Sequence, residues 1–266
     1  MSEILIVHEL EAKLLNKTVE ALSHISLKQN IVTINLEDFL NSSENYFNTN
    51  TEILFLHFDL NNEISSHQLA SKHARRLKLK EINPYNELSE IFDNKFLFYN
   101  FMLANGFKQA KSIKIDRTSN ITQSINIIQN FAQKHNITKL LCKTVHGTES
   151  RDQLKLDINK SQELKQYLNN VHKYDDLLVQ ELIPITNEKK ILCYESNLYC
   201  EQKLRTEEIK LINNFNSAVN FYTQKNNIST IKIYSLDLIN AKQDKLILLE
   251  ANIRPAGIYK QISCID

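Results

Sequence analysis

The chain has 266 residues, of which 42% are hydrophobic and 24% charged, an ordinary composition for a globular protein that buries a real core. Its 32 Lys and Arg residues balance 31 Asp and Glu residues, so a net charge of +1 argues against attachment to nucleic acid or anionic membranes by bulk charge. Only 3 Gly and 3 Pro occur, which excludes collagen-like and flexible-linker architectures.

The four cysteines form no C-x-x-C pair, and no histidine stands at metal-ligand spacing from them. Neither a zinc knuckle nor a disulfide framework is therefore indicated. The first residues are acidic rather than basic, and no apolar segment approaches the ~20 residues of a membrane span. We expect a soluble, cytoplasmic protein that holds reduced thiols.

The first eighty residues alternate short apolar runs with amphipathic stretches. Three runs rich in β-branched residues predict strands at 3–7, 31–36 and 53–58. Apolar residues at helical spacing predict helices over 10–27 and 66–77. Because strands and helices alternate with short connections, we expect a small α/β layer with a parallel sheet.

The rest of the chain mixes both kinds of element. Pro84 excludes a helical conformation at Asn83. Patterning predicts helices over 93–105, 121–135, 161–171 and 207–224. Strands are expected at 139–143, 177–182, 190–194 and 198–204, before a final hairpin. Gly106 follows the first of these helices as its C′ residue.

The final hairpin, within 231–257, carries the clearest chemical signal. If Gln243 and Asp244 form a two-residue turn, Asp237 faces Glu250 across the hairpin, and Asn252 shares their face. Directly opposed carboxylates destabilise a sheet unless a cation lies between them. Two carboxylates and an amide suit Mg²⁺ or Mn²⁺. The alternative interpretation is a solvated polar face on an edge hairpin.

The residues that follow extend the same strand face. Arg254 continues the alternation of Asn252, so its guanidinium would neutralise a phosphate or hold a substrate carboxylate. A surface arginine is the alternative. Gly257 would let backbone approach a ligand closely.

Five segments in this order resemble the ATP-grasp carboxylate–amine ligases, among them glutathione synthetase, D-alanine–D-alanine ligase, the ribosomal-protein glutamate ligase and the L-amino-acid ligases. The segments are 83–107, 141–151, 178–188, 203–205 and 237–257. The resemblance implies an α/β ATP-grasp fold with a small N-terminal parallel α/β domain. It also implies three parts: residues 1–82 as this domain, 83–180 as the first ATP-grasp lobe, and 181–266 as the lobe with the metal hairpin.

The resemblance assigns ATP-binding roles residue by residue. Lys95 and Lys143 match the two lysines that reach the nucleotide, and 146–151, including Gly147 and Ser150, resembles the flexible phosphate loop. His146 in this segment could assist, although one of 8 scattered histidines is expected to be incidental. The segment containing Gln180, Glu181 and Leu182 resembles the strand that holds adenine.

The remaining roles concern ribose, substrate and metal. Glu188 resembles the acid that takes the ribose hydroxyls, and Lys203 and Arg205 occupy the region of a further phosphate or substrate cation. With Arg254, these two cations are the expected catalytic residues. Asp237, Glu250 and Asn252 match the metal triad, so the implied cofactors are ATP and Mg²⁺ or Mn²⁺.

The implied activity is ADP-forming ligation of a carboxylate to an amine through an acyl-phosphate, on amino-acid or peptide substrates. The alternatives are an ATP-grasp phosphotransferase and a non-catalytic nucleotide-binding subunit. The second gains weight from the glycine-poor phosphate loop and its Asp152. No nucleic-acid or membrane partner is expected, and a homodimer or a partner subunit is compatible with the resemblance.

Overall fold

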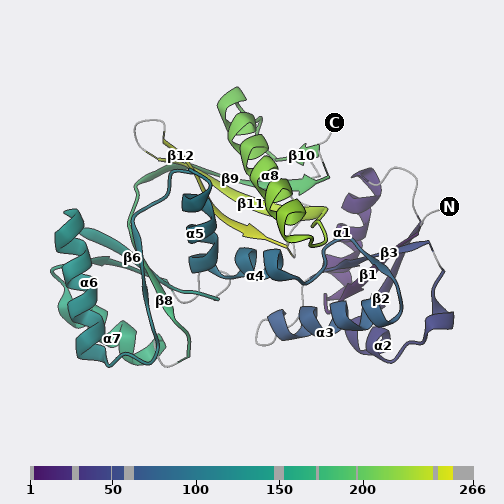
Figure 1. The fold of residues 1–266 in the computed structure, drawn as a ribbon, viewed down its shortest axis with the longest axis horizontal. Coiled ribbons are helices and arrows are strands. Elements are labelled where there is room, and N and C mark those ends of the chain that lie inside the picture. Colours follow the sequence, from purple (N-terminus) through teal and green to yellow (C-terminus); the bar gives the residue numbers. More distant parts are fainter. Residues whose placement is uncertain are drawn as a thin grey trace. The chain divides into compact units, whose positions relative to one another are not determined.

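A computed structural model describes residues 3–25, 30–48, 50–56, 63–146, 153–171, 174–195, 197–241 and 245–253 (Figure 1). The chain divides into two compact units. The larger unit comprises residues 1–93, 188–239 and 248–266, and the smaller comprises 94–187 and 240–247. The division into 1–82, 83–180 and 181–266 stays a prediction.

A parallel sheet opens the larger unit, as the sequence predicts. Its strands run in the order β2-β1-β3-β4, and every pairing is parallel. Their bounds are β1 Glu3–His8, β2 Asn30–Asn35, β3 Thr51–Phe55 and β4 Lys80–Glu81. Strand β1 is buried along nearly its whole length, which fits its continuous apolar sequence and a sheet covered on both faces.

Helices cover both faces of this sheet. Leu22 of α1 (Ala12–Ile25) packs with Ile4 and Ile6 on one face. On the other face, α2 (Leu36–Leu40) and α3 (Glu63–Arg76) pack against Leu5 and Val7 of the same strand. A short 3₁₀ turn, η1 (Glu44–Tyr46), precedes β3. The alternation of side chains along one strand thus supplies two separate apolar clusters.

The second sheet has the order β10-β9-β11-β12. Its strands are β9 (Ile185–Tyr194), β10 (Asn197–Tyr199), β11 (Ile233–Ala241) and β12 (Lys245–Asn252). Helix α8 (Thr206–Asn226) crosses the strands of this sheet (Figure 1). An aromatic group, Phe92 of α4 (Glu87–Asp93), Phe215 of α8 and Tyr234 of β11, joins the three elements.

The smaller unit is built on an antiparallel sheet of order β5-β8-β6-β7. Its strands are β5 (Ser112–Ile115), β6 (Lys139–Thr144), β7 (Leu154–Asp157) and β8 (Leu177–Glu181). Helices α6 (Ile121–His135) and α7 (Ser161–Val171) pack on one face through Ile128, Phe131, Leu164 and Leu168 (Figure 1). Helix α5 (Lys95–Ala104) also belongs to this unit.

Two predicted elements need correction. The helix predicted over 93–105 begins at Lys95, because the Asn94 side chain accepts hydrogen bonds from the N–H groups of Phe96 and Leu97 and so caps α5. The separate helix α4 was not predicted. The strand predicted over 198–204 ends at Tyr199, because the chain then turns toward the N-cap of α8.

Asn83, placed before Pro84, is a fully buried side chain that joins two chain segments of the larger unit. Its Nδ2 donates to the carbonyl oxygens of Phe55 and Ile253, and its Oδ1 accepts from Phe55 N–H. Asn83→Ala removes three hydrogen bonds to buried backbone groups and should lower the free energy of unfolding by about 2–4 kcal/mol. Urea unfolding measures this. Asn197→Ala, at an exposed position, is the control, and equal stability of both variants would contradict the role of Asn83.

Candidate functional site

Strand β11 carries a carboxylate into the interior. Its residues from Ile233 to Ile239 are all buried, and Asp237, between Leu236 and Leu238, is only 7% exposed. Because the flanking leucines lie in the core, the Asp237 side chain between them is buried as well. A buried acid carries a large desolvation cost unless it is paired.

Glu250 of β12 lies beside this acid, as the hairpin pattern predicts. Glu250 lies close enough to act electrostatically on the Asp237 carboxyl group, and Lys190 Nζ of β9 is 3.6 Å from Asp237 Oδ1. Burial, and then the charge of Glu250, raise the pKa of Asp237 to about 7, and Lys190 opposes this. Glu188, two residues before Lys190, adds further negative potential. The like charges therefore strain the site when it contains no compensating cation.

One oxygen of this group has no hydrogen-bond partner. Within the described part of the chain, Asp237 Oδ1 is the buried side-chain atom for which none is found. Asn252 lies two residues after Glu250 on β12, on the same strand face, and is half-buried. No cluster of three or more His, Cys, Asp or Glu side chains suited to a metal occurs among the described residues. An orphaned carboxylate oxygen, a second carboxylate and an amide nevertheless fit Mg²⁺, which completes its shell with water and phosphate.

The two predicted nucleotide lysines lie at one end of β6 in the smaller unit. Lys143 is a residue of β6 and is only 6% exposed. Lys95 begins α5, and its N–H donates to Val145 O at 3.2 Å while its Nζ lies 3.5 Å from the same oxygen. Lys95 is thereby attached to Val145, which lies two residues after Lys143 in the chain. These two cations are the part of the predicted ATP site that the smaller unit brings together.

The predicted adenine segment is the end of β8 and the residue that follows it. Gln180 is buried, and its Nε2 donates to Ser112 Oγ at 2.9 Å. The N–H groups of Glu181 and Leu182 donate to the carbonyl oxygens of Lys111 and Lys139. These two N–H groups are therefore already hydrogen-bonded, to the residue before β5 and to the first residue of β6, and are not available to a base bound here.

Lys203 and Arg205, the predicted substrate cations, precede α8. Lys203 is exposed, and its carbonyl oxygen accepts a hydrogen bond from Lys189 Nζ. Arg205 is the N-cap residue of α8, and its Nε lies 3.3 Å from Glu207 and 3.2 Å from Glu208. The ion pairs give Arg205 a structural role at the helix start. Gly147, Ser150 and Arg254 lie outside the described residues.

The sequence patterns missed three polar contacts. Lys190 and Glu188 lie two residues apart on β9, so strand periodicity places them on one face, but it does not specify that this face lies near Asp237. Lys189 and Glu208 form a buried ion pair at 2.7 Å. The contact between His146 Nδ1 and Asp175 Oδ1, at 3.0 Å, joins residues 29 apart, and no local pattern predicts it.

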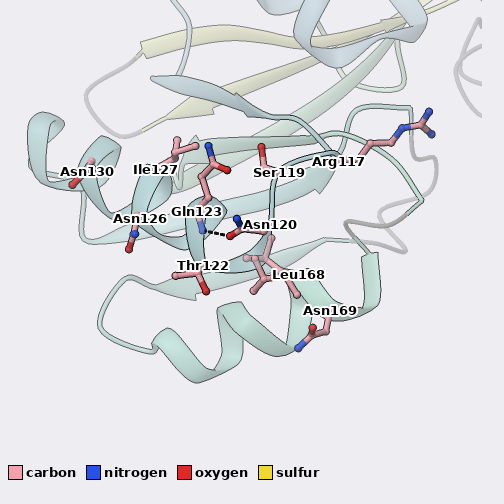
Figure 2. A pocket seen from close by; sticks show the side chains of 11 residues that line it. Arg117, Ser119, Asn120, Thr122, Gln123, Asn126, Ile127, Asn130, Leu168 and Asn169 are labelled. Atoms are coloured by element: carbon pink, nitrogen blue, oxygen red, sulfur yellow. Dashed lines mark hydrogen bonds between the residues drawn. The ribbon is translucent and has the colours of Figure 1, made fainter.

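Cavities elsewhere have different linings. One hollow, of about 980 Å³, lies beside α6 and α7 in the smaller unit (Figure 2). Figure 2 shows Gln123, Asn126 and Asn130 on α6 and Asn169 on α7 around it. No predicted site residue lines this hollow. No helix in the described part of the chain is long and apolar enough to cross a membrane.

Comparison with solved structures identifies the fold. No family model matches the chain, and no curated protein matches it. Among solved structures, D-cycloserine synthetase is similar with a TM-score of 0.71 at 10% identity, covering 98% of both chains. D-Alanyl-alanine synthetase A from Vibrio cholerae has a TM-score of 0.68 at 11% identity, covering 98% of this chain and 92% of the other.

A third similar structure contains ligands. It is a RiPP-associated ATP-grasp ligase from Chryseobacterium gregarium in complex with ADP and a leader and core peptide. Its TM-score is 0.61 at 12% identity, covering 97% of this chain and 91% of the other. At these identities the likeness concerns the fold. The chain therefore has the ATP-grasp fold, and the predicted fold class is confirmed.

Proposed function

We propose that the chain is an ATP-dependent ligase that joins a carboxylate to an amine and releases ADP and phosphate. The observation that carries this proposal is the buried carboxylate of Asp237 beside the partly buried Glu250, with one Asp237 oxygen lacking a hydrogen bond. A structural role alone gives no reason to bury a carboxylate directly beside a second one. The ATP-grasp fold and the buried Lys143 add support.

The residues receive the following roles in this proposal. Asp237, Glu250 and Asn252 would hold Mg²⁺ or Mn²⁺, which when bound supplies positive charge to the phosphate oxygens of ATP. Lys95 and Lys143 bind phosphates through charge-assisted hydrogen bonds. The nucleoside is assigned to the strand end at 180–182 and to Glu188, and the substrate carboxylate to the cations Lys203, Arg205 and Arg254.

The chemistry balances without a side-chain nucleophile. An oxygen of the substrate carboxylate attacks the γ-phosphorus of ATP, the bond to the bridging oxygen breaks, and ADP leaves. The amine then attacks the carbonyl carbon of the acyl-phosphate, loses a proton and expels inorganic phosphate. We assign amino acids or peptides as substrates, since one structure with this fold holds a peptide and another is a D-alanyl-alanine synthetase.

The direct test is to incubate the purified chain with Mg·ATP, with and without pooled amino acids, and to identify the products by mass spectrometry. We expect ADP, phosphate and a new amide mass that appear together. Phosphate transferred to an acceptor without amide formation would favour the phosphotransferase alternative. The absence of both turnover and Mg·ATP binding would favour a non-catalytic subunit, and either result would contradict the ligase assignment.

Lys143 offers a separate test of nucleotide binding. Removing its charge in Lys143→Ala should weaken Mg·ATP binding by at least about ten-fold, because a hydrogen bond to a charged group contributes about 1.5–3 kcal/mol. Lys143→Met keeps the apolar stem packed and should show the same loss in calorimetric titration. Lys139→Ala changes an exposed lysine on the same strand and is the control. Unchanged affinity in both Lys143 variants would remove this lysine from the site.

A further inference from the structure

His146, the first residue of the segment that resembles the phosphate loop, contacts one carboxylate through both its backbone and its ring. Its backbone N–H donates to Asp175 Oδ2 at 2.7 Å, and its ring Nδ1 lies 3.0 Å from Asp175 Oδ1. Asp176 N–H donates to the same Oδ1 at 2.8 Å. Three donors therefore converge on the carboxylate of Asp175. An asparagine at this position could not accept all three hydrogen bonds, because its NH₂ group would face one of the donors.

The second ring nitrogen of His146 connects to the start of α5. Nε2 lies 3.1 Å from Asn94 Nδ2. The Asn94 Oδ1 already accepts from Phe96 and Leu97, so the amide must present its NH₂ to the ring. With Asp175 accepting from Nδ1–H, Nε2 keeps its lone pair and accepts from Asn94. The contacts thus select one tautomer and one ring orientation.

This chain of hydrogen bonds ends beside the predicted nucleotide lysines. Asn94 directly precedes Lys95, whose N–H donates to Val145 O. Val145 in turn donates from its N–H to Asp176 O at 2.9 Å. Val145 and His146 are therefore joined on one side to the turn before β8 and on the other to the start of α5. Hydrogen bonds therefore link the end of β6, where Lys143 lies, to the start of α5, where Lys95 lies.

We propose that His146 is a positioning residue for the nucleotide phosphates, oriented by Asp175 and acting through Asn94 on the place of Lys95 relative to Lys143. The proposal rests on the proposed ATP-binding function, because the two lysines are assigned to phosphate there. His146 itself need not touch the nucleotide. The prediction is that the three side chains Asp175, His146 and Asn94 work as one unit in nucleotide binding.

A double-mutant cycle tests this unit with substitutions that each remove only one link. His146→Asn keeps an N–H at the position of Nδ1, and so the contact to Asp175, but cannot reach Asn94. Asn94→Ser keeps a good N-cap for α5 but removes the amide that reaches the ring. Each single variant should weaken Mg·ATP binding by about three- to ten-fold, as the loss of one hydrogen bond implies. The double variant should bind Mg·ATP no more weakly than the weaker-binding of the two single variants.

Calorimetric titration with Mg·ATP, well below the unfolding temperature of every variant, supplies the readout. Asp175→Asn should weaken binding at least as much as His146→Asn. Asp116→Asn removes a carboxylate from the same unit, one that pairs with Lys114 and not with His146, and should bind like the wild type. Thermal unfolding of each variant is recorded separately, since a purely structural role would lower the unfolding temperature and leave the affinity of the folded protein unchanged.

The outcomes separate this proposal from the function it rests on. Affinity losses that multiply in the double variant would show independent roles and contradict the unit, as would wild-type affinity in His146→Asn and Asp175→Asn. A wild-type protein that does not bind Mg·ATP contradicts the proposed function itself, and the positioning role with it. Binding by the wild type together with a shared, non-additive loss in the variants supports both.

Discussion

Glu250→Gln is expected to abolish Mg²⁺-dependent ATP turnover, with a loss of at least about 100-fold, because metal coordination supplies several kcal/mol of charge stabilisation in phosphoryl transfer. The same change should leave the fold intact. It removes a charge that opposes the buried Asp237 carboxylate, so without metal the variant should equal or exceed the wild type in stability by up to about 1 kcal/mol.

Two measurements separate these effects. ADP release at saturating ATP over a series of Mg²⁺ concentrations reports on the metal, and thermal unfolding in EDTA reports on the repulsion between the carboxylates. Glu201→Gln, at an exposed position in the same unit, is the matched control and should change neither. A Glu250→Gln variant that keeps wild-type turnover would remove the metal assignment, whatever its stability.

The second large effect concerns stability and the buried pair of Lys189 and Glu208. Their side chains are 7% and 1% exposed, and Glu208 also accepts from the N–H of Arg205 at 2.7 Å. Glu208→Gln leaves the Lys189 ammonium buried without its counter-charge, which should lower the free energy of unfolding by about 3–5 kcal/mol. Lys189→Met combined with Glu208→Leu should recover much of the loss, since an apolar pair needs no compensating charge.

The same pair predicts a pH dependence with a definite sign. Burial alone would raise the pKa of Glu208, but hydrogen bonds from Arg205 N–H and Lys189 Nζ outweigh it and hold the pKa below its usual value of 4.5. A carboxyl group whose pKa is lower in the folded state stabilises the protein at pH values above its unfolded-state pKa. This contribution is lost as the pH falls through the folded-state pKa. The stability difference between wild type and Glu208→Gln should therefore shrink below pH 4.5.

Urea unfolding at pH 7 and over an acid series measures both quantities, with the slope of the transition checked for constancy. Glu163→Gln breaks an exposed pair with Lys160 and should cost less than about 1 kcal/mol. A loss in Glu208→Gln no larger than this control would mean that the buried pair contributes little. A stability difference that grows toward acid pH would contradict the direction of the pKa shift.

Sequence patterns predicted the bounds of helices and strands best where capping residues mark their ends. The bounds of α6 match the prediction because Asn120 caps its first turn and Asn136, in the left-handed conformation, ends it. The start of α5 was misplaced by two residues because Asn94 lies between two helical segments. The strand predicted over 198–204 was too long, because the Lys203 carbonyl bonds to the Lys189 side chain instead of to a neighbouring strand.

In the candidate site, too, some contacts follow from local sequence patterns and others do not. Proximity of Asp237 and Glu250 followed from strand alternation and a short turn, although residues 242–244 themselves lie outside the described part of the chain. The approach of Lys190 to Asp237 depends on how β9 joins the sheet, which no local pattern specifies. The contacts of Asp175 with His146 depend on the packing of the turn before β8. Such long-range pairings are decided by tertiary structure, so one sequence could not have predicted them.

The central claim is that a carboxylate is activated by ATP, and the path of one oxygen atom tests it most directly. The wild-type chain is incubated with Mg·ATP and pooled amino acids whose carboxylates carry ¹⁸O, and the mass of the released inorganic phosphate is measured. Ligation through an acyl-phosphate predicts phosphate with one ¹⁸O atom, formed together with ADP and a new amide. Phosphate without the label would mean that water accepted the phosphoryl group, and would contradict the ligase mechanism.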